Sequence, residues 1–355
     1  MRNEEPGRIA DRAPQGALWI ALLLSAAIGA CGKSSSSPTD GGHPAEAGTP
    51  KDAGSDGPSI ATACGDLAQA LCAKRMSCSS VNVALVYGDL PTCVARETLS
   101  CANALASPGE GDTPAMVEAC ATAYAAVSCA DYHQDNPPAA CNVVGPRATG
   151  VACTFDGQCA SDYCSGNKNA LCGTCSAPPA AGASCASSFC GHDQECVDAT
   201  MLCQTYGAAT ASCSADLPCG DTLSCTGATT TVAGTCQTAE ASGAACGGTL
   251  PGCDGFRGFF CAGATGAKTC VPISYVADGM PCGDQTSTFV QCTKGSCYTG
   301  TGLATGTQVG TCKANAADGA GCDPVLGPAC TFPARCVSGA DGGSTCVVPT
   351  GANCG

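Results

Sequence analysis

Cysteine is the residue type in this chain that is best placed to do chemistry. The sequence has 35 cysteines in 355 residues, about one residue in ten, and three histidines. One Cys-x-x-Cys pair, Cys172 and Cys175, has the spacing of a redox motif, but its neighbours are Gly, Pro and Ala instead of a helix start in a βαβ unit. A zinc site would use two such pairs. We therefore expect structural disulfides, no catalytic residues, no metal and no cofactor.

The other candidate residues for chemistry are few. No Gly-x-Ser-x-Gly, His-Glu-x-x-His or phosphate-loop motif occurs in the sequence. His192 is the histidine next to a carboxylate, while His43 is expected to be solvated and His133 to lie on the surface. Several loop acids have Ca²⁺-binding side chains but no ordered ligand loop, so we expect solvated turn residues at Asp156, Asp162, Asp221, Asp254, Asp284 and Asp341.

The composition predicts a chain held together by cross-links. Trp19 lies near the N-terminus and is the single tryptophan, and the chain has seven Tyr and seven Phe. Large side chains supply most of the energy of a buried core, so disulfides must substitute beyond residue 150. This cysteine content is typical of proteins of oxidising compartments. The net charge of −14 disfavours nucleic acid and anionic lipid as partners and favours solubility.

An export segment is predicted at the N-terminus. Residues 17–29 form an apolar run that is too short for a bilayer, which needs roughly 20 residues, but suits a signal peptide. The run ends in Ile-Gly-Ala before Cys31, which resembles the lipobox of bacterial lipoproteins. The resemblance implies that residues 1–30 are removed and that Cys31 is lipidated and anchored to the cell envelope, with the outer membrane favoured because no Asp follows it. The alternative is ordinary cleavage after Ala30. Without Cys31, 34 cysteines remain, and all can pair.

Two regions follow the anchor. Residues 31–59 are rich in Ser, Gly and Pro and are expected to be a disordered linker. Residues 60–141 are expected to form a cysteine-rich helical domain with three main helices, since apolar residues recur at helical spacing from Cys64 to Arg75 and helix caps stand at Asp89 and Thr113. Tyr87, Tyr124 and Tyr132 are expected in core or rim packing. About four disulfides of undetermined pairing should link Cys64, Cys72, Cys78, Cys93, Cys101, Cys120, Cys129 and Cys141.

Residues 142–355 form an array of cysteine-rich repeats. Gly stands three residues before the first cysteine in five of six repeats, whose first cysteines are Cys153, Cys185, Cys213, Cys246, Cys282 and Cys322. The third and fourth cysteines of a repeat are expected on the two arms of a β-hairpin, with first–third and second–fourth pairing favoured among three patterns. The predicted fold is therefore a tandem array of small disulfide-rich modules with short β-hairpins and little regular structure, preceded by a disulfide-clipped α-helical domain. We expect the modules to be strung like beads, and Cys354 to begin an incomplete seventh repeat.

The first repeat has a more specific pattern. Asp156 lies between Cys153 and Cys159, Tyr163 precedes Cys164, and Cys172 and Cys175 follow, so that the stretch resembles the Dickkopf N-terminal cysteine-rich region over residues 153–175. That family is secreted and disulfide-bonded, and in animals it antagonises Wnt signalling through co-receptor ectodomains. The resemblance implies a disulfide module.

Together these patterns predict a cell-envelope lipoprotein that acts as a non-catalytic surface binding or structural protein. Its expected partners are the membrane, through the lipid, and an extracellular protein or glycan of unknown identity. The alternatives are an inhibitor of extracellular hydrolases, a Dickkopf-like secreted ligand module, and a hydrolase with an unrecognised site in residues 60–141.

Overall fold

The computed structural model describes residues 57–354, apart from short gaps at 167–169, 187–188, 198–199, 215–216, 229–231, 248, 265, 286–287, 305–307, 324 and 340–341. The predicted signal peptide, Cys31, His43, Asp341 and most of the predicted linker lie outside the described residues. Among the helices that are described, none has the length and apolar character needed to cross a membrane.

A helical domain comes first and contains the three expected helices. Its elements are α2 (Ile60–Cys78), α3 (Ser80–Val86), α4 (Leu90–Leu105), α5 (Pro114–Tyr124), α6 (Cys129–His133) and the short η1 (Ala139–Cys141). The backbone N–H of Thr92 donates to the Asp89 carboxylate at 2.7 Å, and the N–H of Met116 donates to the Thr113 hydroxyl at 3.3 Å. These bonds satisfy N–H groups that have no partner inside the helix. The short helices α3 and α6 were not expected.

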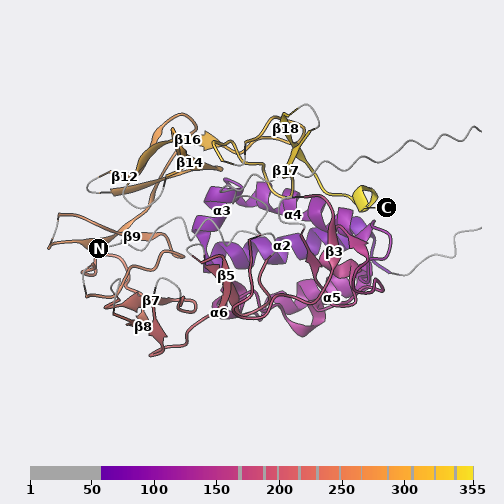
Figure 1. The fold of residues 1–355 in the computed structure, drawn as a ribbon, viewed down its shortest axis with the longest axis horizontal. Coiled ribbons are helices and arrows are strands. Elements are labelled where there is room, and N and C mark those ends of the chain that lie inside the picture. Colours follow the sequence, from indigo (N-terminus) through magenta and orange to yellow (C-terminus); the bar gives the residue numbers. More distant parts are fainter. Residues whose placement is uncertain are drawn as a thin grey trace, which may run out of the picture.

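Six repeats follow, each built around a short antiparallel hairpin (Figure 1). Repeats 1 to 4 contain β1 (Ala152–Cys153), η2 (Asp156–Gln158), β2 (Cys164–Ser165), β3 (Gly173–Cys175), β4 (Gln194–Val197), β5 (Leu202–Thr205), β6 (Ser212–Cys213), β7 (Leu223–Thr226), β8 (Gly234–Thr238), β9 (Phe259–Ala262) and β10 (Thr269–Pro272). Repeats 5 and 6 contain β11 (Ser274–Val276), β12 (Pro281–Gln285), β13 (Thr288–Cys292), β14 (Gly295–Thr299), β15 (Gly302–Leu303), β16 (Val309–Ala314), β17 (Arg335–Ser338), β18 (Ser344–Val347) and the terminal η3 (Gly351–Cys354). Repeat 5 has more strand than expected, because β11 to β16 form one six-stranded sheet.

The disulfide pattern within the repeats is the expected one. The third and fourth cysteines of every repeat face each other across the hairpin, as Cys261 and Cys270 do. Neither bonds to the other, because the third cysteine bonds the first and the fourth bonds the second. The first–third and second–fourth prediction is confirmed in all six repeats by the bonds 153–164, 159–175, 185–196, 190–203, 213–225, 219–236, 246–261, 253–270, 282–297, 292–312, 322–336 and 330–346.

The glycine three residues before the first cysteine makes a fixed turn. Gly243 has φ +81°, its N–H donates to the carbonyl of Cys270, the fourth cysteine, at 2.8 Å, and a Cβ there would meet no atom within 4 Å. The other four glycines have the same left-handed conformation and the same bond to their own fourth cysteine. Glycine is therefore used for its backbone conformation and not for close packing.

Repeat 3 makes the same turn without glycine. Thr210 occupies the position with φ +68°, and its N–H donates to the Cys236 carbonyl at 2.8 Å. A β-branched residue in this region is strained. The shared hydrogen bond therefore imposes the conformation even where the residue type opposes it.

The repeats do not hang as separate beads, and this expectation was wrong. Figure 1 shows hairpins on several sides of the helices. Each repeat also contacts the helical domain. The largest apolar contact joins Val81 and Leu85 of α3 to Phe260 and Ile273 of repeat 4 and Phe289 of repeat 5. The physical reason is that single repeats have few large side chains, so they bury those they have against the helices. Representative contacts from repeats 1, 2, 3, 5 and 6 are Gly157–Gly111, Asp193–Gln134, Asp221–His133, Lys294–Ala84 and Asp318–Arg96.

The chain end also differs from the expectation. Cys354 does not begin a seventh repeat but bonds to Cys172 of repeat 1, at a sequence separation of 182. The backbone of Gly351 lies so close to Ser107 that a Cβ at 351 would be 2.5 Å from the Ser107 hydroxyl. The last residues therefore join the end of the array to its beginning, next to the end of α4.

The turn at Thr210 gives a direct test of the repeat architecture. We expect Thr210→Gly to stabilise the folded protein by about 0.5–1 kcal/mol, because relief of left-handed strain exceeds the entropy that glycine adds to the unfolded chain. Gly243→Ala should destabilise it by about 1 kcal/mol for the opposite reason. Guanidinium unfolding with the disulfides intact measures both, and a loss of stability in Thr210→Gly would contradict this account.

Candidate functional site

The expected half-cystines are all paired among the described residues. In the helical domain the disulfides are Cys64–Cys101, Cys72–Cys93, Cys78–Cys129 and Cys120–Cys141, a pairing that the sequence left open. In repeat 1 they are Cys153–Cys164 and Cys159–Cys175, while Cys172 bonds outside the repeat. Cys172 and Cys175 are therefore not bonded to each other and do not form a redox pair.

Cysteine groups with metal-like geometry occur in the repeats. The sulfurs of Cys153, Cys159 and Cys175 lie within 4.8 Å of one another, and similar groups occur in other repeats. Each of these sulfurs is already in a disulfide, so it offers no thiolate, which is the form that binds a metal. The closeness of the sulfurs follows from two disulfides packed side by side.

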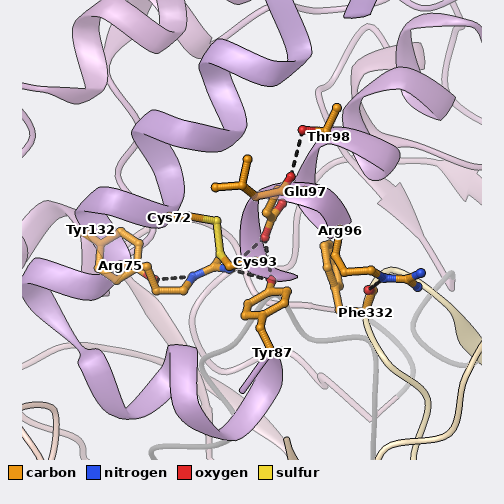
Figure 2. Close-up of polar contacts among 10 residues, drawn as sticks. Cys72, Arg75, Tyr87, Cys93, Arg96, Glu97, Thr98, Tyr132 and Phe332 are labelled. Carbon is orange, nitrogen blue, oxygen red and sulfur yellow. Dashed lines mark hydrogen bonds and ion pairs between the residues drawn. A yellow bond between two sulfur atoms is a disulfide. The ribbon is translucent and has the colours of Figure 1, made fainter. Parts of the chain in front are cut away.

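The most extensive buried polar group lies in the core of the helical domain (Figure 2). Arg75 of α2 donates from Nη1 to Glu97 of α4 at 2.8 Å and to the Tyr87 hydroxyl at 2.6 Å. Tyr87 donates to the same Glu97 oxygen at 2.6 Å, and Arg75 Nε donates to the Tyr132 hydroxyl at 2.9 Å. The Arg75 and Glu97 side chains are 6% and 9% exposed, so the ion pair is shielded from water. We call these four residues the Arg75 network.

Burial keeps the two tyrosines of this network protonated. Burial and the adjacent Glu97 carboxylate raise the pKa of Tyr87 well above its usual value, so Tyr87 remains a neutral phenol that donates its proton. Burial also raises the pKa of Tyr132. The groups bond to one another across α2, α4, α6 and the segment after α3, beside the Cys72–Cys93 disulfide. The arrangement ties these elements of the helical domain together.

The same region anchors repeat 6. Arg96 lies one residue before Glu97 and forms a two-bond pair with Asp318, at 2.7 Å for each bond. Arg96 also donates to the Thr331 carbonyl at 3.0 Å and to the Phe332 carbonyl, and the Phe332 ring packs edge-on against Tyr87 at 6.2 Å. A paired guanidinium and carboxylate fixes direction as well as distance. The Arg75 network therefore contacts repeat 6 through Tyr87 and Phe332.

Two histidines join repeats to the helical domain, and His133 was wrongly expected on the surface. His133 is 6% exposed, its Nε2 lies 3.4 Å from the Asp221 carboxylate of repeat 3, and its ring lies 3.9 Å from that of Phe256 in repeat 4. His192 makes a hydrogen bond to the Asp135 carbonyl. Sequence alone could not place His133, since its contacts with the Cys78 carbonyl, Asp221 and Phe256 join positions 55 or more residues apart. Both side chains serve as contacts between parts of the fold.

Two loop acids also differ from the expectation of solvated turn residues. Asp221 and Asp254 are each 7% exposed. Asp221 is buried because it packs against His133, and Asp254 because it accepts from the N–H of Arg257 at 3.2 Å within its own turn. Asp156 is exposed and accepts from the N–H of Cys164 at 2.7 Å, so it shapes the turn of its repeat.

A further acidic residue, not singled out from the sequence, lies where repeat 1 meets the helices. Burial and the neighbouring Asp112 raise the pKa of Glu110 to about 7. A Cβ at Gly157 of repeat 1 would lie 1.9 Å from Glu110 Oε1, and the N–H of Gly111 donates to the Gly157 carbonyl at 2.9 Å. A side chain at 157 would therefore displace the Glu110 carboxylate from its present position.

A scan of protein-family models, a search of curated proteins and a search of solved structures each found no match for this chain.

The Arg75 network predicts a large effect of one substitution. Glu97→Ala should lower the free energy of unfolding by about 3–5 kcal/mol, because it leaves the Arg75 charge buried without its counter-ion. Guanidinium unfolding of the oxidised protein measures this loss. Glu118→Ala, on the partly exposed part of α5, is the matched control and should change stability by less than about 0.5 kcal/mol. Equal effects of the two variants would refute the structural role of the network.

Proposed function

We propose that this chain is an exported, lipid-anchored and non-catalytic binding protein of a bacterial cell envelope. The observation that carries the proposal is the set of 17 disulfides, which use every cysteine after Cys31 and cross-link every repeat. Disulfides in such number form and persist in oxidising compartments. The lipobox-like sequence before Cys31 supports anchoring through lipid at that residue.

The rigidity of the repeat array favours binding. Six repeats are cross-linked internally and docked on one helical domain, so their exposed turns are held at fixed spacing. Binding to a preorganised surface loses less conformational freedom than binding to a flexible one. A linker between lipid and fold would let this surface reach partners away from the membrane.

The polar groups in the described core favour a non-catalytic role. Arg75, Glu97 and His133 are engaged with groups from other elements and hold those elements together. General acid–base or nucleophilic chemistry requires such groups to face a substrate. We assign them to stability, and we assign function to the exterior of the repeats.

The net charge of the chain limits the classes of partner that it would attract. With 29 acidic and 15 basic residues, the protein would attract a basic protein surface more strongly than nucleic acid or an acidic glycan. We therefore favour an extracellular or envelope protein with a basic surface as the partner, with a neutral glycan as the other candidate.

The anchor has a specific test. We expect radiolabelled palmitate to enter the full-length protein when it is produced in a bacterial host, and not to enter a Cys31→Ser variant. The variant should also be released from the membrane fraction, because Cys31 supplies the acyl chains that bind the bilayer. Equal labelling of the two proteins would overturn the lipid assignment while leaving the binding proposal open to its own test.

Binding is tested with the oxidised protein as bait. The oxidised chain, immobilised and exposed to envelope and medium fractions, should retain a partner that elutes as salt is raised, since salt screens charge attraction. The matched control is the same chain after reduction and capping with neutral iodoacetamide, which keeps sequence and charge but removes the cross-links. Recovery of no partner, or equal recovery by both baits, would count against a rigid binding surface.

A further inference from the structure

The Cys172–Cys354 disulfide differs from all others in what it joins. Twelve disulfides lie inside single repeats with separations of 11–20 residues, and four lie inside the helical domain. Cys172–Cys354 alone connects two distant parts of the chain, repeat 1 and the C-terminal η3, across 182 residues. Cleavage of this one bond would open the array without unlinking any repeat.

This disulfide also contains the most accessible half-cystine of the described chain. Of the 34 half-cystines, all of which lie in described parts of the chain, Cys172 alone is exposed, and the others are buried or partly buried. Its partner Cys354 is 8% exposed. Thiol–disulfide exchange requires a thiolate to reach one sulfur of the bond, so access directs attack to Cys172.

One contact of Cys354 favours its sulfur as the leaving group when a thiolate attacks Cys172. Thr154, which is fully buried, donates its hydroxyl to the Cys354 sulfur at 3.0 Å. A hydrogen bond to sulfur stabilises the thiolate that forms when the bond breaks, and a better-stabilised thiolate leaves faster. Attack at the exposed sulfur therefore expels the sulfur that already has a hydrogen-bond donor.

From these observations we propose that Cys172–Cys354 is a site of thiol–disulfide exchange with an external dithiol, which opens the repeat array. The first thiolate of the dithiol attacks Cys172 and forms a mixed disulfide, while Cys354 leaves as a thiolate and takes up a proton. The second thiol of the dithiol then attacks the dithiol's first sulfur, which is bonded to Cys172 in the mixed disulfide. This closes a disulfide within the dithiol and releases Cys172 as a thiolate, which takes up a proton. The dithiol is oxidised to a disulfide, and the protein gains two electrons and two protons as two thiols.

Opening would act on a defined segment. Once the bond is broken, the C-terminal segment 349–354 is held by few contacts, which include the bond from Asn103 Nδ2 to the Pro349 carbonyl at 3.1 Å and the close approach of Gly351 to Ser107. Release of this segment would uncover the buried Ser107 and Thr154 at the junction of α4 and repeat 1. The two disulfides in each repeat would keep the hairpins intact.

The test uses the oxidised full-length protein and dithiothreitol as the dithiol. Samples are quenched over time with N-ethylmaleimide, and labelled cysteines are identified by peptide mass spectrometry. We expect Cys172 and Cys354 to be labelled at least ten times faster than any cysteine of a repeat or of the helical domain. Labelling of an in-repeat pair at the same rate would overturn the proposal.

A variant tests the rate of disulfide exchange, and a second measurement tests whether the C-terminal segment is released. Thr154→Val, which keeps shape but removes the donor, should slow labelling of Cys354 at least threefold, whereas Thr331→Val, at another buried threonine, should not. Hydrogen exchange of residues 347–354 should rise in the singly reduced protein, while that of residues 282–312 stays unchanged. Unchanged exchange at 347–354 would show that the bond is reducible but does not hold the array closed, which would refute the opening step.

Discussion

The structure depends on the way each hairpin sets the pairing of its cysteines. The third and fourth cysteines stand directly opposite each other on neighbouring strands, as Cys336 and Cys346 do, yet each bonds a cysteine that precedes the hairpin. The two closed loops therefore interleave, and neither arm can separate from the preceding turn without bond cleavage. Closing loops of 11–20 residues is worth about 3 kcal/mol each in the chain-entropy model. A two-stranded hairpin that is marginal alone thereby becomes a stable unit.

Sulfur replaces the apolar core inside repeats but not between them. In repeat 1 the buried cluster consists of Cys153, Cys159, Cys164 and Cys175. Between one repeat and another, Phe260 stacks on Phe289 at 4.3 Å. Between repeats and helices, the contacts include the apolar side of α3 and the Arg96–Asp318 pair. Covalent bonds thus determine each repeat, while packing on the helical domain determines how repeats lie relative to one another.

Local features were predictable from sequence because their causes are local. Helix caps at Asp89 and Thr113 and the hairpin around Cys261 and Cys270 depend on residues close to one another in the sequence. Contacts across the fold were not predictable in this way. His133 has no signal of burial in its own segment, because Asp221 and Phe256 create that environment, and the seven-residue α3 is too short for a reliable helical period. The separate-bead expectation failed for the same reason.

Repeat 1 shows how one extra cysteine changes the topology of the whole array. Every other repeat has four half-cystines, whereas repeat 1 has Cys172 in addition, placed in the loop before its fourth half-cystine, Cys175. Without a partner inside the repeat, Cys172 bonds outside it, and Cys354 of η3 supplies that partner. Repeats 1 and 6 both contact the helical domain, and Arg335 donates to the Ala170 carbonyl at 2.8 Å beside the bond. The bond therefore joins segments that packing also holds together, so we expect its loss to change access to a junction and to leave the rest of the fold in place.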